Sequence, residues 1–151
     1  MFIDKELAMQ TYENDVTAWS SEQARLLREG RFDLLDIEHI ADEIESVGKC
    51  ELRELVNHMT KLITHLLIWQ HQPGRRGRSW EVAIKSQRKN ISYALWESPS
   101  LTLRILEPRW LDIVWTRAVA QFVIETGQDR FPDECPWSFQ DQVLAETWLP
   151  D

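Results

Sequence analysis

An unbroken helical periodicity between Leu35 and Gln72 constrains the fold more than any other feature of the chain. Apolar residues recur about every 3.6 positions, so they fall on one stripe of a single helix. The stripe comprises Ile37, Ile40, Ala41, Ile44, Val47, Gly48, Leu52, Leu55, Met59, Leu62, Leu66 and Trp69. Because Asp36 is a suitable N-cap and Pro73-Gly74 stop a helix, we predict one helix at about residues 36–71, buried along this stripe.

Gly48 is the position at which that helix could divide into two. A break usually resets the phase of the pattern, whereas the phase here is the same on both sides of the glycine. We therefore predict a continuous helix in which Gly48 marks a close crossing with another helix. At 1.5 Å per residue this helix is roughly 50 Å long, which exceeds the width of a globule of this chain length, so it must protrude, bend or pair.

The rest of the chain shows the helical period in shorter segments. We predict further helices at about residues 11–30, 79–97, 101–106, 109–126 and 138–147. Ser79 is the expected cap of the second of these helices, and Gly127 ends the fourth. No segment alternates polar and apolar residues between turn signals, as a strand would. The sequence predicts an all-α fold, a small helical bundle organised on one long helix, in a single domain of residues 1–151.

Charge is distributed unevenly along the chain. The net charge of −8 argues against general binding to nucleic acid or to an anionic membrane. Residues 73–97 nevertheless form a basic island with six basic and two acidic side chains. The basic residues are Arg75, Arg76, Arg78, Lys85, Arg88 and Lys89. Three interpretations remain open: pairing with acidic groups within the chain or between subunits, binding of an external anion with a base stacked near Trp80 or Tyr93, or no specific role.

An acidic run lies at the start of the long helix, in residues 32–48, which contain no lysine or arginine. Its members include Asp36, Glu38, Asp42, Glu43 and Glu45. Like charges at neighbouring helix positions repel by a few tenths of a kcal/mol per pair, so a compensating cation is expected. We predict that Arg88 forms a hydrogen-bonded ion pair with Glu43 or Glu45, because its planar fork can bind a carboxylate through two bonds.

Two alternatives for catalysis or metal binding use residues of the long helix. Arg53 and His58 have an Arg-x4-His spacing that resembles the signature of the helical ribonucleases of the HEPN superfamily. Five residues correspond to about 140° around a helix, so these two side chains do not share a face. Glu54, His58 and His65 could face one way and hold a metal, but no Glu-x-x-His motif is present. We predict no metal and no cofactor, and keep both alternatives.

Cys50 and Cys135 are the only cysteines, and neither has a partner at metal-ligand spacing. Without a signal peptide or an apolar run near 18 residues, the sequence predicts a cytoplasmic protein with reduced thiols and no membrane partner. No Gly-rich phosphate loop or Gly-x-Ser-x-Gly elbow is present, so no motif supports catalysis. Eight tryptophans must be buried or must mark an interface.

Short motifs occur in a definite order over nearly the whole chain. The first half contains Tyr12, Asp15, Trp19, Leu35-Asp36, Asp42-Glu43-Ile44-Glu45, His65-Leu66-Leu67 and Trp69. The second half contains Ser79-Trp80, Ile84, Arg88, Ser98-Pro99-Ser100-Leu101, Glu125-Thr126-Gly127, Phe131-Pro132 and Cys135-Pro136. This order resembles the bacterial family called "domain of unknown function 29". The resemblance implies a small all-helical protein of undetermined activity and carries over no catalytic residue.

The long helix, the tryptophans and the missing catalytic motif together predict a non-catalytic protein-interaction module. Its expected partner is a second copy of the chain or another protein, and not nucleic acid. Residues with a predicted structural or interaction role are Glu43, Glu45, His65, Trp80 and Arg88. Residues predicted to bind an anion or a partner are Arg75, Arg76, Arg78, Lys85 and Lys89.

Overall fold

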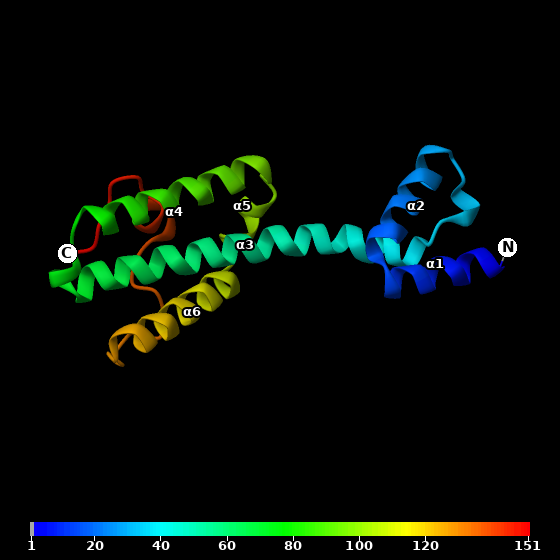
Figure 1. The fold of residues 1–151 in the computed structure, drawn as a ribbon. Coiled ribbons are helices and arrows are strands. Elements are labelled where there is room, and N and C mark those ends of the chain that lie inside the picture. The colour runs from blue at the N-terminus through cyan, green and yellow to red at the C-terminus, as the bar shows by residue number, and fades with distance from the viewer. Residues whose placement is uncertain (1) are drawn as a thin grey trace. The chain divides into compact units, whose positions relative to one another are not determined.

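The computed structural model describes the backbone of residues 2–151 and the side chains of residues 6–151. Its helices are α1 (Phe2–Asn14), α2 (Val16–Arg28), α3 (Ile37–His71), α4 (Arg78–Glu97), α5 (Leu101–Arg104) and α6 (Pro108–Thr126). Two 3-10 turns occur at Phe32–Leu34 and Pro73–Arg75, and a π-helical turn occurs at Phe139–Val143. Residues 2–151 contain no strand, so the all-α prediction is confirmed (Figure 1). None of their helices is long and apolar enough to cross a bilayer.

The predicted long helix is confirmed as α3, which runs without interruption from Ile37 to His71 (Figure 1). Asp36 begins it as expected, since the amide of Ile40 donates to the Asp36 carbonyl at 3.0 Å. At the other end the amide of Gln72 donates to the carbonyl of Ile68 at 2.8 Å. Proline follows directly and ends the helix.

The predicted burial of α3 holds only for its second half. Leu55, Met59, Leu62 and Leu66 are fully buried, whereas the earlier stripe residues Ile37, Ile44 and Val47 are 64%, 68% and 65% exposed. At Gly48 a Cβ atom would meet nothing within 4 Å, so the predicted close helix crossing there is wrong. A periodic sequence sets the direction of an apolar stripe, but only another element lying against the stripe can bury it.

The contacts divide the chain into two compact units, Met1–Cys50 and Glu51–Asp151, which we call the N-terminal unit and the C-terminal unit. Helix α3 contributes residues to both of them. The assignment of the whole chain to a single domain stays a prediction.

In the N-terminal unit, the single helix predicted at about residues 11–30 is instead two helices, α1 and α2. The break lies at Asp15, whose carboxylate accepts a hydrogen bond from the amide of Ala18 at 3.0 Å and so caps α2. An aspartate competes in this way with the continuing helix for backbone amides. Gly30 then reverses the chain with a φ of 71°, in the left-handed region that glycine tolerates best.

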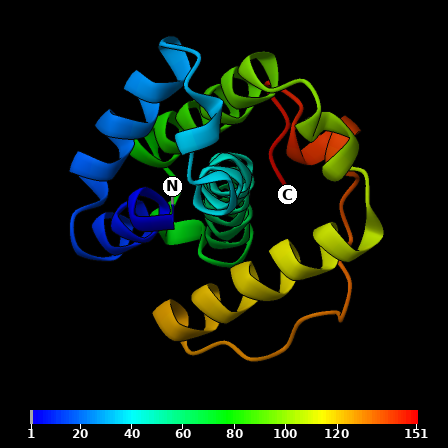
Figure 2. The same cartoon turned by 90° about the vertical axis from the view of Figure 1, so that its right-hand side faces the viewer.

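In the C-terminal unit, α4 and α6 lie on different sides of the second half of α3 (Figure 2). The core between them includes Ile63, Leu66, Ile84, Val114 and Phe122. The segment after α6 adds Trp137, Phe139 and Val143 to this core. It is tied down further by the indole N–H of Trp115, which donates to the carbonyl of Pro132 at 3.1 Å.

The predicted helix ends in this unit have different outcomes. Gly127 ends α6 with a φ of 75°, as predicted. The predicted cap at Ser79 is wrong, because α4 begins one residue earlier, after Gly77, and no side chain caps it. The last helix predicted at about 138–147 is shorter than expected, although the hydroxyl of Ser138 does accept from the amide of Asp141 at 3.3 Å.

Candidate functional site

Arg88 on α4 is a charged residue in the interior of the C-terminal unit, with 7% of its surface exposed. Its guanidinium donates only to backbone oxygens of the C-terminal segment. These are the carbonyls of Val143 at 3.0 Å, Trp148 at 2.6 Å, and Gln142 and Glu146 at 3.4 Å. Burial lowers the pKa of Arg88, but an arginine remains charged at neutral pH. Arg88 therefore fastens the end of the chain to α4.

The ion pair predicted between Arg88 and Glu43 or Glu45 is wrong. Glu43 instead accepts a hydrogen bond from the hydroxyl of Tyr12 at 2.7 Å, and Glu45 lies 3.7 Å from Lys49 on its own helix. The guanidinium fork is satisfied by four backbone carbonyl oxygens of the C-terminal segment, of which that of Gln142 also accepts from the amide of Ala145 at 3.1 Å. Every residue has a backbone oxygen, so residue types do not indicate which carbonyls will accept from Arg88. The sequence therefore pointed only to carboxylates.

Most of the basic island lies in solvent. Arg78, Lys85 and Lys89 are exposed and fall at i, i+7 and i+11, on one face of α4. Among the side chains of residues 6–151, none of the three lies within 4 Å of a carboxylate. Three large side chains share this side of the helix, namely Val82, Tyr93 and Trp96, which are 54%, 58% and 74% exposed. We call this set of six residues the α4 face.

The two remaining arginines of the island lie in the turn between α3 and α4. Arg76 donates from Nε to the carbonyl of Trp69 at 2.7 Å, and its guanidinium carbon lies 5.5 Å from the centroid of that indole. Arg76 thus holds the turn against the end of α3. Arg75 is exposed in the 3-10 turn.

His65 and Trp80 lie together, as an edge-to-face pair with ring centroids 5.1 Å apart. His65 also borders a polar pocket of about 490 Å³ between α3 and α6. The pocket is lined by Asn57, Thr60, Lys61, Thr64, His65, Gln121 and Glu125. Burial lowers the pKa of His65, so its ring is neutral at pH 7. Within residues 6–151, His65 Nδ1 and Thr60 Oγ1 are buried without a hydrogen-bond partner.

The residues of the two alternative sites, the ribonuclease-like pair and the metal site, lie in different surroundings. His58 Nδ1 lies 3.0 Å from Gln87 Oε1, so this histidine joins α3 to α4. Arg53 and Glu54 are exposed, and His65 lies against Trp80. Among the described residues, no group of three His, Cys, Asp or Glu side chains could hold a metal ion. Cys50 and Cys135 are both free thiols.

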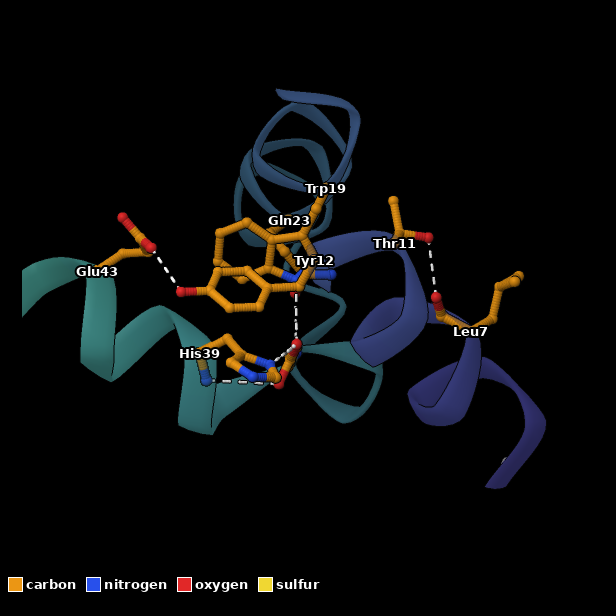
Figure 3. A network of polar contacts seen from close by, with 8 residues as sticks. Leu7, Thr11, Tyr12, Trp19, Gln23, His39 and Glu43 are labelled. Carbon is orange, nitrogen blue, oxygen red and sulfur yellow. Dashed lines mark hydrogen bonds and ion pairs between the residues drawn. The ribbon is translucent and has the colours of Figure 1, made fainter. Parts of the chain in front are cut away.

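The N-terminal unit contains a polar cluster that the sequence did not predict, in which Trp19, Gln23 and His39 (Figure 3) surround the buried Asp36. Asp36, only 7% exposed, accepts from the indole N–H of Trp19 at 3.0 Å and lies 2.7 Å from His39 Nδ1. Its own amide donates to the side-chain oxygen of Gln23 at 2.8 Å. The cluster therefore connects α2 to the beginning of α3.

Tyr12 extends this cluster to α1. Its ring stacks on His39 with centroids 3.9 Å apart, and its hydroxyl donates to Glu43 (Figure 3). The hydrogen bond to the carboxylate raises the pKa of Tyr12. Tyr12, Trp19 and Asp36 are among the positions that carry the family resemblance, but their spacing shows no helical or strand period that would bring them together.

These features define an all-α protein in which buried polar side chains join helices to one another and to the C-terminal segment. The model of the family described as "Domain of unknown function DUF29" matches residues 11–149 of the chain. The protein therefore belongs to this family, as the resemblance in its motifs predicted. No curated protein and no solved structure matches the chain.

Proposed function

We propose that the protein is a non-catalytic interaction module that associates with itself or with a partner protein. The observation that carries this proposal is the exposed apolar stripe at the start of α3. Ile37 and Ile44 lie seven residues apart on one side of the helix, Val47 lies near them, and all three are more than half exposed. Exposed apolar patches rimmed by polar residues are typical of protein interfaces.

The contacts that the candidate polar residues make within the fold support the same proposal. His58 contacts Gln87, Arg88 binds backbone carbonyls, and Trp80 packs on His65. Each of these contacts joins elements of the C-terminal unit, so each side chain already has a role in the fold. Catalysis requires instead a reactive group that is free to meet a substrate in a suitable geometry.

Light scattering across micromolar concentrations, together with affinity purification from the source cells, tests the proposal. We expect Ile44→Asp to weaken self-association or partner capture at least about tenfold, because a carboxylate would be buried in the contact. Ile124→Asp is the matched control, since Ile124 is 79% exposed on α6. Both variants should retain the helical circular dichroism of the wild type. A protein that stays monomeric and captures no partner, or one that responds equally to both changes, would contradict the proposal.

A further inference from the structure

We infer that the partner is a second copy of this chain, and that the acidic and apolar start of α3 in one copy docks on the α4 face of the other. This inference rests on the proposed function and names its partner. The first surface, which we call the α3 face, consists of Glu38, Asp42 and Glu45, which lie at i, i+4 and i+7 on one side of α3, and of Ile37 and Ile44, which flank Glu38 and Glu45 about 100° around the helix.

The α3 face carries negative charge that its surroundings do not compensate. Among residues 6–151, Glu38 and Asp42 form no ion pair. Glu45 has a single contact, with Lys49, in which the two side chains are 71% and 69% exposed. An ion pair in that much solvent stabilises little and leaves the carboxylate available to another cation.

The α4 face has the opposite charge, and like the α3 face it combines charged with exposed apolar side chains. Arg78, Lys85 and Lys89 leave three cations in solvent beside Val82 and Trp96. A helix face that combines cations with large exposed apolar side chains suits a partner that is both acidic and apolar. The α3 face has this composition.

Charge decides which faces can meet. Two α3 faces would place carboxylate against carboxylate, and two α4 faces would place cation against cation. Like charges juxtaposed in an interface cost several kcal/mol. Contact between an α3 face and an α4 face neutralises both and covers the apolar side chains that flank the charges.

The spacing of the acidic residues on α3 matches the spacing of the basic residues on α4. Glu38 and Asp42 are four residues apart, as are Lys85 and Lys89. Neighbouring charges on each helix are therefore separated by about 6 Å along the axis, so two helices lying side by side can form both pairs together. Because every copy carries one face of each kind, copies can join in a closed ring or in an open series.

A nucleic acid is a weaker candidate for the α4 face. Two residues of the predicted site, Trp80 and Arg88, pack inside the unit on His65 and on backbone carbonyls, which leaves Tyr93 and Trp96 as the exposed stacking side chains. The net charge of −8 also opposes a polyanion.

Charge reversal tests the inference directly. One variant combines Glu38→Lys with Asp42→Lys, and the other combines Lys85→Glu with Lys89→Glu. Each variant alone should raise the dissociation constant for self-association at least about 100-fold, because its two faces then have the same charge. An equimolar mixture of the two should associate again, since each face of one variant is complementary to a face of the other.

The quadruple variant should likewise associate with itself, because both of its faces are reversed. Matched controls place the same charge changes at exposed positions outside the two faces: Asp112→Lys with Asp129→Lys, and Arg117→Glu with Arg130→Glu. These controls should associate as the wild type does. Circular dichroism establishes that each variant is folded, and light scattering over a concentration series measures its mass. Wild-type association should weaken as salt is added.

The outcomes separate this inference from the proposed function. Association that survives both double variants but is lost in Ile44→Asp would overturn the pairing of the two faces and leave the interaction module standing. A mixture that fails to associate would overturn the inference as well. A monomeric wild type whose Lys85 and Lys89 bind a single-stranded oligonucleotide would overturn both.

Discussion

The two units of this protein are stabilised in different ways. The C-terminal unit buries twenty apolar side chains in one core. Among the described side chains of the N-terminal unit, only Trp19, Leu26 and Leu35 are both apolar and buried, and they lie with the buried polar residues Gln23 and Asp36. One unit therefore depends mainly on apolar area, and the other depends on a few hydrogen bonds that join its helices.

This difference shows that the apolar stripe of a single helix can be buried in one unit and exposed in the other. The apolar period of α3 is the same throughout, but it is buried from Leu55 onward and exposed at Ile44 and Val47. Regions with few buried apolar contacts open more easily than well-packed cores. We therefore expect amide hydrogens of the N-terminal unit to exchange faster than those of α3 after Leu55.

The largest effect is expected for Arg88→Ala. It removes the donors of the carbonyls of Val143, which is buried, and Trp148, which is half-buried, so both oxygens lose this partner. The free energy of unfolding should fall by about 3–5 kcal/mol. Urea unfolding measures this loss, and hydrogen exchange should locate it in residues 139–149. Arg88→Lys retains the charge with a single donor group and should recover part of it. Equal loss of protection in the N-terminal unit would contradict the separation of the two units.

Trp19→Phe should have the next largest effect, in the N-terminal unit. It deletes the indole N–H that donates to the buried carboxylate of Asp36. A buried group that loses one partner costs about 1–3 kcal/mol. Trp110→Phe is the matched control, because the indole N–H of Trp110 is buried without a partner among the described residues. Thermal and urea unfolding of both variants give the difference due to the hydrogen bond. Equal destabilisation would show that ring volume matters and the hydrogen bond does not.

Asp15→Ala should cost about 1 kcal/mol, the usual effect of losing an N-cap. Its carboxylate accepts from the amide of Ala18 at the start of α2, so faster exchange is expected in the first turn of α2. Asp133→Ala changes an exposed aspartate outside both helices and should leave stability unchanged. If Asp15→Ala instead lengthens α1 into α2 without loss of stability, the cap is not what separates these helices.

The smallest effect concerns pH and the C-terminal unit. Burial lowers the pKa of His65 from its usual value of 6.5, with Lys61 acting in the same direction and Glu125 opposing it. The unfolded state therefore binds a proton at a higher pH than the folded state does. The stabilisation due to neutral His65 is complete above pH 6.5 and declines as the pH falls below that value. His65→Gln should reduce this pH dependence of unfolding, whereas identical pH profiles would show that His65 does not contribute.

The sequence predicted more of the secondary structure than of the site. The continuity of α3 through Gly48 and the end of α6 at Gly127 followed from local signals, because period and backbone conformation are local properties. The break at Asp15 was missed because the side chain competes with a helical pattern that continues on both sides. The partners of Arg88 were missed because they are backbone oxygens more than fifty residues away along the chain.

By itself the sequence determined that this chain is helical, that α3 is one helix, and which side of α3 is apolar. These properties depend on residues within a few turns of one another. Only the tertiary structure decided that this apolar side is covered after Leu55 and open at Ile44, that Asp36 meets Trp19, and that Arg88 closes on the C-terminal segment. Burial and buried hydrogen bonds require partners that the fold brings together. The identity of a side chain does not specify which residue distant in the sequence will be its partner.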